Sequence, residues 1–250
     1  MRLQSLDYRY ANAVLEDPAF GEAKAEILEI LRAAPVPLLD PNELSARRGG
    51  VKRRTRDRSR PSVDQRFIFL PVNQKALNIH LDEAFKSKGW QLQPPIVSRE
   101  RQGGPETGLK GDYKKGLVQV EAQFGNMARW YTDVFKFQLS YSLGEIDVAV
   151  LIVPTRAFAN LIDENVANFE RVSRELPWAK MSLTLPILVI GIEPDDYGLV
   201  RQCYERAGET FALDRQQAGV SVQVVPFDTR LLETPEAEVT EDEPATDGSE

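Results

Sequence analysis

The hydrophobic pattern of the chain changes period several times. Residues 146–153 and 185–192 are almost continuously apolar over the length of a strand, which is typical of strands buried on both faces. Residues 116–124 alternate and are rich in Val, and residues 220–225 predict a last strand. Apolar stripes at three- and four-residue spacing predict helices at 17–35, 73–88, from 127 onward, at 162–176 and at 197–207. This order predicts an α/β fold with a mixed central β-sheet flanked by helices.

The net charge of −7 is unevenly distributed along the chain. Residues 233–250 contain eight acidic residues and no basic ones, so that residues 1–232 have a net charge of +1. Low hydrophobicity and high charge predict that this acidic tail is disordered. We expect residues 1–232 to form one domain, and its near-neutral charge leaves room for a basic face that binds nucleic acid.

Several classes of protein are disfavoured by what the chain lacks. No apolar run approaches the roughly 18 residues of a membrane span, and residues 1–10 are polar, so we expect a cytoplasmic protein with no membrane partner. One cysteine, Cys203, and one histidine, His80, exclude an internal disulfide and a Cys/His zinc site. His80 is not accompanied by a nucleophile motif, which argues against a triad hydrolase.

Basic residues are concentrated in residues 47–60, which carry eight of them with one acidic residue and a Gly-Gly pair. The run has no periodicity and predicts a mobile loop. It is either a solvated charged surface or an arm that binds DNA phosphates through residues such as Arg53 and Arg54 and releases counterions. Arg99 and Arg101, in a loop-like region rich in Pro and Gly, are further candidates for phosphate contacts.

Residues 111–126, with the sequence GDYKKGLVQVEAQFGN, carry the candidate chemistry. Side chains alternate between the faces of a strand, so Gln119, Glu121 and Gln123 share one face. We expect this polar face to line a cleft or solvent rather than the core. A half-exposed strand with no catalytic role remains an alternative.

A metal site is predicted at the start of this stretch. A hairpin turn at residues 113–116 would bring Asp112 alongside Glu121. Two close carboxylates repel each other unless a cation lies between them, and Mg²⁺ is a hard cation that binds carboxylates together with phosphate oxygens. The carbonyl of Ala122 is a further candidate ligand. Such an ion supports hydrolysis of a phosphodiester, although the D-x8-E spacing alone is a weak signal.

Two polar residues follow the strand near the beginning of the next helix. Asn126 can form two hydrogen bonds with an adenine edge, and Arg129 lies where a helix N-terminus favours phosphate. Each also has a simpler interpretation: Asn126 as a helix N-cap, and Arg129 as part of a solvated helix face.

The stretch resembles a known family when its surroundings are included. Followed by an aromatic-rich helix and IDVAVLIVP, it is similar to the BglII/BstYI family of type II restriction endonucleases, as are the upstream segments LDYRYANAVLEDPAFGEAKAEILEIL and VNQKALNIHLDEAFKSKGW. The resemblance covers residues 6–227. It implies the PD-(D/E)XK nuclease fold and a Mg²⁺-dependent homodimer that cuts double-stranded DNA at a palindrome with a GATC core. It also implies 5′ overhangs with 5′-phosphate ends, and a cognate DNA methyltransferase in the same host.

The resemblance assigns roles to individual residues. Asp112 and Glu121 take the two acidic positions that bind the metal, with the carbonyl of Ala122. Gln123 takes the position that usually holds lysine, where it is implied to orient the attacking water. Asn126 is implied to belong to the DNA-reading surface.

Two departures from the superfamily pattern accompany these assignments. Gly111 stands where proline is common, which we interpret as a minor change. Gln123 has no positive charge, and this keeps two alternatives open: a catalytically silent DNA-binding protein, and a repair or recombination nuclease of the same superfold. Gln93 is a further candidate for a supporting polar position.

Overall fold

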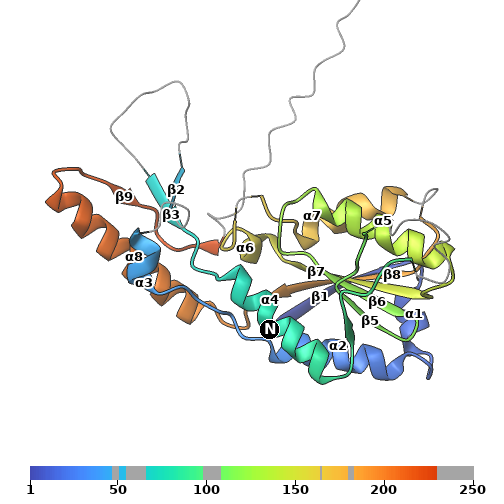
Figure 1. The fold of residues 1–250 in the computed structure, drawn as a ribbon. Helices are drawn as coiled ribbons and strands as arrows, with labels where there is room; N and C mark the ends of the chain where they lie inside the picture. Colours follow the sequence, from blue (N-terminus) through green and yellow to red (C-terminus); the bar gives the residue numbers. More distant parts are fainter. Residues whose placement is uncertain (47–50, 55–65, 98–107, 164, 180–182, 230–250) are drawn as a thin grey trace, which may run out of the picture.

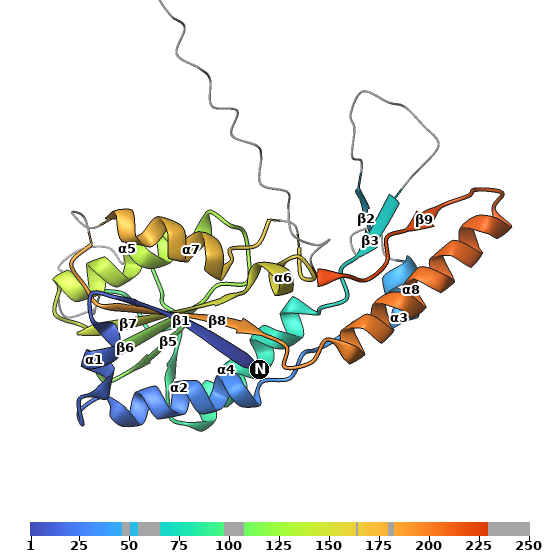
Figure 2. The same cartoon turned by 180° about the vertical axis from the view of Figure 1, so that it is seen from behind.

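The computed structural model describes residues 1–46, 51–54, 66–97, 108–163, 165–179 and 183–229. These residues form a main body built on a six-stranded sheet and a smaller lobe built on a three-stranded sheet (Figure 1). The lobe projects from one end of the body, as both ribbon views show (Figures 1 and 2).

The main sheet has the strand order β1-β8-β7-β6-β5-β4. Strands β6, β7 and β8 are parallel, while β1, β5 and β4 pair antiparallel with their neighbours, so the sheet is mixed as predicted. The strands are β1 (Arg2–Tyr8), β4 (Gln91–Leu92), β5 (Tyr113–Lys115), β6 (Val118–Ala122), β7 (Val148–Pro154) and β8 (Ile187–Glu193).

Helices cover both faces of this sheet. On one face lie α2 (Gly21–Ala33) and α4 (Gln74–Ser87), and on the other lie α5 (Arg129–Ser142) and α7 (Phe169–Glu175) (Figures 1 and 2). Alternate residues of the fully buried β7 belong to two separate apolar clusters, one on each face. This explains why the strand is apolar throughout. The remaining body helices are α1 (Ala11–Glu16), α6 (Arg156–Ala159) and the 3-10 turn η2 (Leu176–Ala179).

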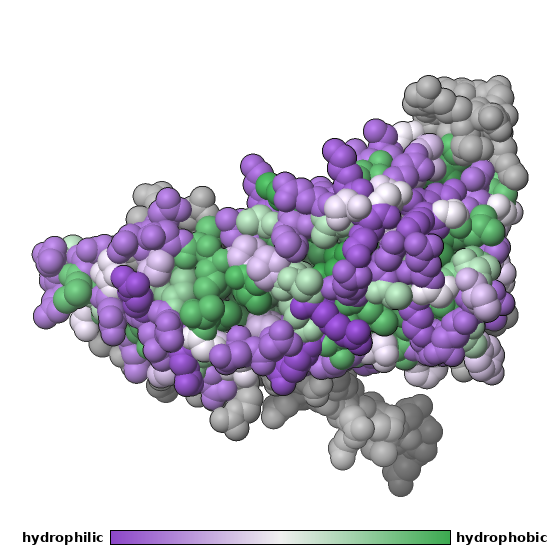
Figure 3. All heavy atoms as spheres, turned by 90° about the horizontal axis from the view of Figure 1, so that it is seen from below, coloured by the Kyte–Doolittle hydropathy of each residue, from purple (hydrophilic) through white to green (hydrophobic). Residues whose placement is uncertain are grey.

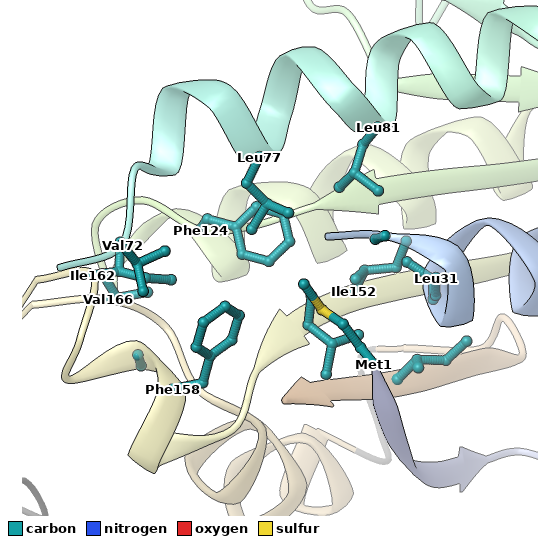
Figure 4. Close-up of a cluster of buried hydrophobic side chains, with 14 of the residues drawn as sticks. Met1, Leu31, Val72, Leu77, Leu81, Phe124, Ile152, Phe158, Ile162 and Val166 are labelled. Carbon is teal, nitrogen blue, oxygen red and sulfur yellow. The ribbon is translucent and has the colours of Figure 1, made fainter. Parts of the chain in front are cut away.

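The apolar cluster under α4 joins the body to the segment that leads to the lobe. Leu77 and Leu81 of α4 are directed toward Ile152 of β7 and Phe124, the second residue after β6 (Figure 4). Val72, which connects the lobe to α4, donates its amide to the carbonyl of Leu161 at 3.2 Å. The carboxyl ends of β6 and β7 are therefore packed close to this connection.

The second lobe has its own small core. It contains β2 (Val51–Arg54), β3 (Arg66–Phe69) and β9 (Gln223–Val224), with α3 (Pro41–Ala46) and α8 (Gly198–Gln217). Phe69 packs edge to face on Tyr204 and Phe211 of α8, with ring centroids 5.4 and 5.7 Å apart. Hydrophilic residues cover most of the lower surface of the molecule, with apolar areas between them (Figure 3). None of the described helices is both long enough and apolar enough to span a membrane.

Most predicted elements are confirmed, and three of the differences have clear physical reasons. Strand β1 was not predicted because it lies at the sheet edge and is mostly exposed, so its pattern is not apolar. The helix predicted at 162–176 begins only at Phe169, since the side chain of Asn168 caps it by accepting the Arg171 amide. The last helix continues past residue 207 to Gln217, and Gly208 does not end it: a Cβ atom there would lie 3.0 Å from Val224 of β9, so glycine permits the close packing of β9 on the helix.

The basic run at residues 47–60 contains a strand rather than being a loop throughout. Residues 51–54 form β2, which pairs antiparallel with β3 and is the edge strand of the small sheet. Charged residues are compatible with an edge strand, where they discourage pairing with other chains. The rest of the run lies outside the described residues, as do Arg99, Arg101 and the acidic tail at residues 233–250.

Candidate active site

The β5–β6 hairpin brings the two predicted acids together. Asp112 immediately precedes β5, and Glu121 lies near the end of β6, in antiparallel register. Asp112 Oδ2 accepts a hydrogen bond of 2.8 Å from the amide of Ala122. The turn passes through Gly116, whose φ of +56° favours glycine. The predicted hairpin is therefore present. Burial is the main cause of a raised pKa at Glu121, and the neighbouring Asp112 carboxylate raises this pKa further.

Contacts from α4 and β4 fix the position of Asp112. The ring of Tyr113 stacks on Phe85 of α4 with centroids 4.0 Å apart, and its hydroxyl donates to Asp82 at 2.8 Å. The amide of Gln93 donates to the Asp112 carbonyl at 2.9 Å. Gln93 has a φ of +48°, an uncommon value for a residue with a side chain, and its side chain is exposed. Gln93 thus supports Asp112 through its main chain.

The polar face of β6 is buried, which corrects the expectation of a cleft or solvent. Gln119, Glu121 and Gln123 are only 1%, 0% and 8% exposed. They lie on the same face as the β7 residues that pack against α5, so that this helix covers them. Buried polar groups need hydrogen-bond partners, and here α5 provides several of them.

Two charged residues of α5 contact this face. Lys136 Nζ lies 2.5 Å from Glu121 Oε2 and 2.8 Å from Asp133 Oδ1. Gln123 Nε2 donates to the other oxygen of Asp133, Oδ2, at 2.7 Å. Gln119 Nε2 donates to Glu121 Oε1 at 2.9 Å. Glu121 is therefore held on both carboxylate oxygens by side chains of the protein.

Asp133 and Lys136 were not among the predicted site residues, because amphipathic periodicity places the charged residues of a helix in solvent. Here Tyr131 and Phe135 are exposed, whereas Asp133 and Lys136 face the sheet with Trp130. A usable signal existed in the sequence. A polar strand face covered by a helix needs partners, and positions 133 and 136 are one helical turn apart.

Negative charge is in excess at this site. Burial raises the pKa of Glu121, and Asp112 raises it further, while Lys136 offsets only part of the rise. Burial also raises the pKa of Asp112, against the hydrogen bond from the Ala122 amide. Burial lowers the pKa of Lys136, but Glu121 and Asp133 outweigh it, so the net shift is upward. Three acids, Asp112, Glu121 and Asp133, thus lie near one ammonium group, which contacts the last two.

The donor set fits Mg²⁺. Asp112 and Glu121 supply hard oxygen atoms, and the excess of negative charge attracts a cation. Across the described part of the chain, no group of three His, Cys, Asp or Glu side chains is placed to hold a metal. Two acids are sufficient for Mg²⁺, which usually keeps several waters and binds one or two carboxylates together with substrate phosphate.

Gly111 is a larger departure from the superfamily pattern than expected. Its amide donates to the carbonyl of Pro94 at 2.9 Å, a bond that proline cannot form. A Cβ atom at this position would lie 2.9 Å from Gln119 Nε2 and 2.9 Å from Glu121 Oε1. A larger residue at position 111 would therefore force the Glu121 carboxylate to move.

The structure places Asn126 and Arg129 at the exposed beginning of α5. Both are exposed, and α5 begins at Arg129. The side chain of Asn126 accepts the amide of Ala128 at 2.9 Å and so closes the turn before the helix. Ala128, not Asn126, is the N-cap residue. Both residues follow the acids along the same stretch of chain.

The raised pKa of Glu121 predicts how stability depends on pH without metal. Because the folded-state pKa lies above the unfolded one, stability from this group is fully present below the unfolded pKa. This stability is lost as the pH rises toward the folded-state pKa, because the buried carboxyl of Glu121 then ionises, which glutamine cannot do. From pH 5 to pH 9 in EDTA, we therefore expect the unfolding free energy of Glu121→Gln to rise by on the order of 2 kcal/mol relative to that of the wild type. Urea unfolding measures this, and a relative gain by the wild type would contradict it.

Comparisons with known proteins identify the family of the chain. The family model for the restriction endonucleases BglII and BglIII matches residues 3–192. The type II restriction enzyme BamHI of Bacillus amyloliquefaciens is 28% identical over 114 residues, which span 43% of this chain and only 52% of that enzyme. The fold is similar to that of BglII complexed with a DNA 16-mer, at a TM-score of 0.57 and 18% identity over 78% of each chain. Free BglII gives a TM-score of 0.51 at 18% identity over 78% of this chain and 81% of BglII. The chain belongs to the BglII/BglIII family of restriction endonucleases.

Proposed function

We propose that the protein is a Mg²⁺-dependent type II restriction endonuclease that hydrolyses phosphodiester bonds in double-stranded DNA at a short palindromic site. The observation that carries this proposal is the buried pair of Asp112 and Glu121, with more negative charge than Lys136 neutralises. Family membership supports DNA as the substrate.

Asp112 and Glu121 would hold the metal, with the carbonyl of Ala122 as a third protein ligand. When bound, the ion supplies Lewis-acid stabilisation of charge at the scissile phosphate. The Ala122 amide keeps the Asp112 carboxylate in place through the 2.8 Å hydrogen bond, and Gln119 orients the carboxylate of Glu121.

Gln123 is proposed to position the attacking water. Its Nε2 donates to Asp133 and its Oε1 accepts the amide of Gly125 at 2.8 Å, so the side chain is fixed. An amide nitrogen has two hydrogens and an amide oxygen has two lone pairs, so each atom has capacity for one more hydrogen bond. That capacity is what orientation of a water molecule requires.

The exposed polar residues are proposed to contact DNA. Asn126 and Arg129 follow the carboxyl end of β6, the end that carries Glu121, and both are exposed there to a duplex. Strand β8 points toward the second lobe, and β6 is oriented the same way because β6, β7 and β8 are parallel (Figure 1). The lobe includes β2, which contains Arg53 and Arg54 of the basic run. These two residues, with Arg99 and Arg101, are proposed phosphate contacts.

A homodimer is proposed because the two-fold symmetry of a dimer would match the two-fold symmetry of a palindromic site. Exposed aromatic residues of α5 and η2 are candidates for the interface: Tyr131, Phe135 and Trp178. Tyr131 and Glu175 are hydrogen bonded, which places α5 beside α7 and the adjoining η2. The resemblance further supports a GATC core, 5′-phosphate ends and a cognate methyltransferase in the same host.

Cleavage of plasmid and phage DNA with and without Mg²⁺ tests the proposal. We expect discrete, reproducible fragments that require the metal and have 5′-phosphate ends. Binding without any cleavage of DNA that carries varied sites would instead indicate a catalytically silent DNA-binding protein. Cleavage that depends on DNA structure and not on sequence would indicate a repair or recombination nuclease.

A further inference from the structure

A lysine from α5 lies against the proposed metal-binding acids. Lys136 Nζ contacts Glu121 Oε2 at 2.5 Å, Asp133 Oδ1 at 2.8 Å and the carbonyl of Lys110 at 3.3 Å. The side chains of Lys136 and Glu121 are 11% and 1% exposed. A buried ammonium group with this number of oxygen partners is held in one position.

Lys136 and Gln123 bind the same carboxylate. Gln123 Nε2 donates to Asp133 Oδ2 at 2.7 Å, while Lys136 Nζ lies 2.8 Å from Asp133 Oδ1. The ammonium group is therefore separated from the end of the residue 123 side chain by a single carboxylate. Position 123 is where the superfamily pattern usually has lysine. The positive charge absent from β6 is thus supplied beside it, from α5.

We propose that Lys136 is the active-site lysine of this protein, relocated from position 123, directly after β6, to α5, and that it acts as a positioning residue for Glu121. The inference rests on the proposed function. Three acids, Asp112, Glu121 and Asp133, repel one another in a buried site. Lys136 binds two of them and so keeps the Glu121 carboxylate directed toward the metal position, while Gln123 is free of that task.

Lys136→Met tests this proposal because methionine keeps most of the length of the side chain without its charge. Supporting groups of metal ligands are typically worth about 10- to 100-fold in metal affinity or activity. We expect the single-turnover cleavage rate at saturating Mg²⁺ to fall about 30-fold or more. DNA binding in EDTA should be unchanged, and Lys136→Arg should recover part of the rate.

A charge swap separates positioning from a merely structural ion pair. In Gln123→Lys with Lys136→Gln, the ammonium group returns to position 123, directly after β6, where the present side chain contacts Asp133. We expect this double variant to cleave at least about tenfold faster than Lys136→Met, since the charge and not the identity of the strand or helix is required. In the metal-free protein, the swap should also recover the unfolding temperature that Lys136→Met loses.

Lys115→Met is the matched control. Lys115 is on β5 of the same hairpin and pairs with Glu26 at 2.9 Å, with side chains 29% and 13% exposed. This variant also loses a partly buried ion pair, but should cleave at the wild-type rate. Folding of every variant is checked by circular dichroism, and Mn²⁺ binding by calorimetry.

Three results have distinct meanings. If folded Lys136→Met cleaves at the wild-type rate and only its Mn²⁺ affinity differs, Lys136 only balances the charge of Glu121 in the metal-free protein. That result overturns the inference. A folded swap variant as slow as Lys136→Met would overturn it as well. Wild-type protein that cuts no DNA would contradict the proposed function itself, which the parallel wild-type assay reveals.

Discussion

Glu121→Gln is expected to slow DNA cleavage by on the order of a thousandfold or more, while DNA binding in EDTA stays intact. The substitution removes a charged metal ligand but keeps the shape of the side chain, which is completely buried. The amide oxygen can still accept a hydrogen bond from Gln119 or Lys136. The measurement is the single-turnover rate on a plasmid with one cleavage site, at saturating Mg²⁺.

The structure makes glutamine a better replacement than alanine here. Alanine would leave a cavity and remove one of the two ion-pair partners of Lys136 in a buried site, and breaking a buried pair typically costs about 3–5 kcal/mol of stability. Loss of cleavage would then be confused with loss of folding. Glu145→Gln is a suitable control, because Glu145 pairs with Lys114 at 3.4 Å near the same hairpin. If Glu121→Gln cuts as fast as this control, the site assignment is wrong.

The catalytic hairpin could be predicted from sequence because its determinants are local. Alternation from 118 to 122 predicts that Glu121 and Val120 point to opposite faces of the strand. The turn at Gly116 predicts that the chain folds back so that Asp112 lies beside Glu121. The two apolar strands, β7 and β8, were equally clear, since burial on both faces leaves no polar positions. These features depend on residues that are neighbours along the chain.

The features that could not be predicted depend on distant packing. The edge strand β1 is stabilised by pairing with β8, far along the chain, and its own pattern is weak. Burial of Gln119, Glu121 and Gln123 depends on how α5 lies over the sheet. Amphipathic periodicity alone cannot predict that charged residues of α5 are buried, because it assumes that the surface covered by a helix is apolar.

The burial of polar and charged residues between β6 and α5 has a functional meaning. Natural sequences depart from simple patterning mainly at functional sites, where buried charge has a purpose other than stability. On β6, polar residues occupy positions that a purely structural strand would fill with Val or Leu. On α5, Asp133 and Lys136 occupy the matching positions. The departures from the pattern on the two elements face each other, which is the arrangement expected of a site and not of isolated substitutions.

DNA binding is expected to weaken steeply with salt, through basic residues that include Arg53 and Arg54 of β2. A protein that contacts six to ten phosphates loses about 10³- to 10⁵-fold in affinity between about 50 and 200 mM salt. Each phosphate contact contributes about 0.9 to the slope of log K against log salt. Arg53→Ala with Arg54→Ala should therefore lower the slope by nearly two, with similar losses on cognate and non-cognate DNA, measured by fluorescence anisotropy.

The uniformity of that loss is what distinguishes an arm that binds phosphates from residues that read bases. Contacts to phosphate carry no sequence information, whereas loss of a base contact such as that proposed for Asn126 should reduce discrimination between sites. Lys24→Ala with Lys86→Ala is the matched control, since it removes two positive charges from α2 and α4, on the sheet face opposite α5. If the control lowers the slope as much as the arginine pair, net charge and not the basic run determines the salt dependence. If neither pair changes it, the phosphate contacts lie elsewhere, and the arm is a solvated surface.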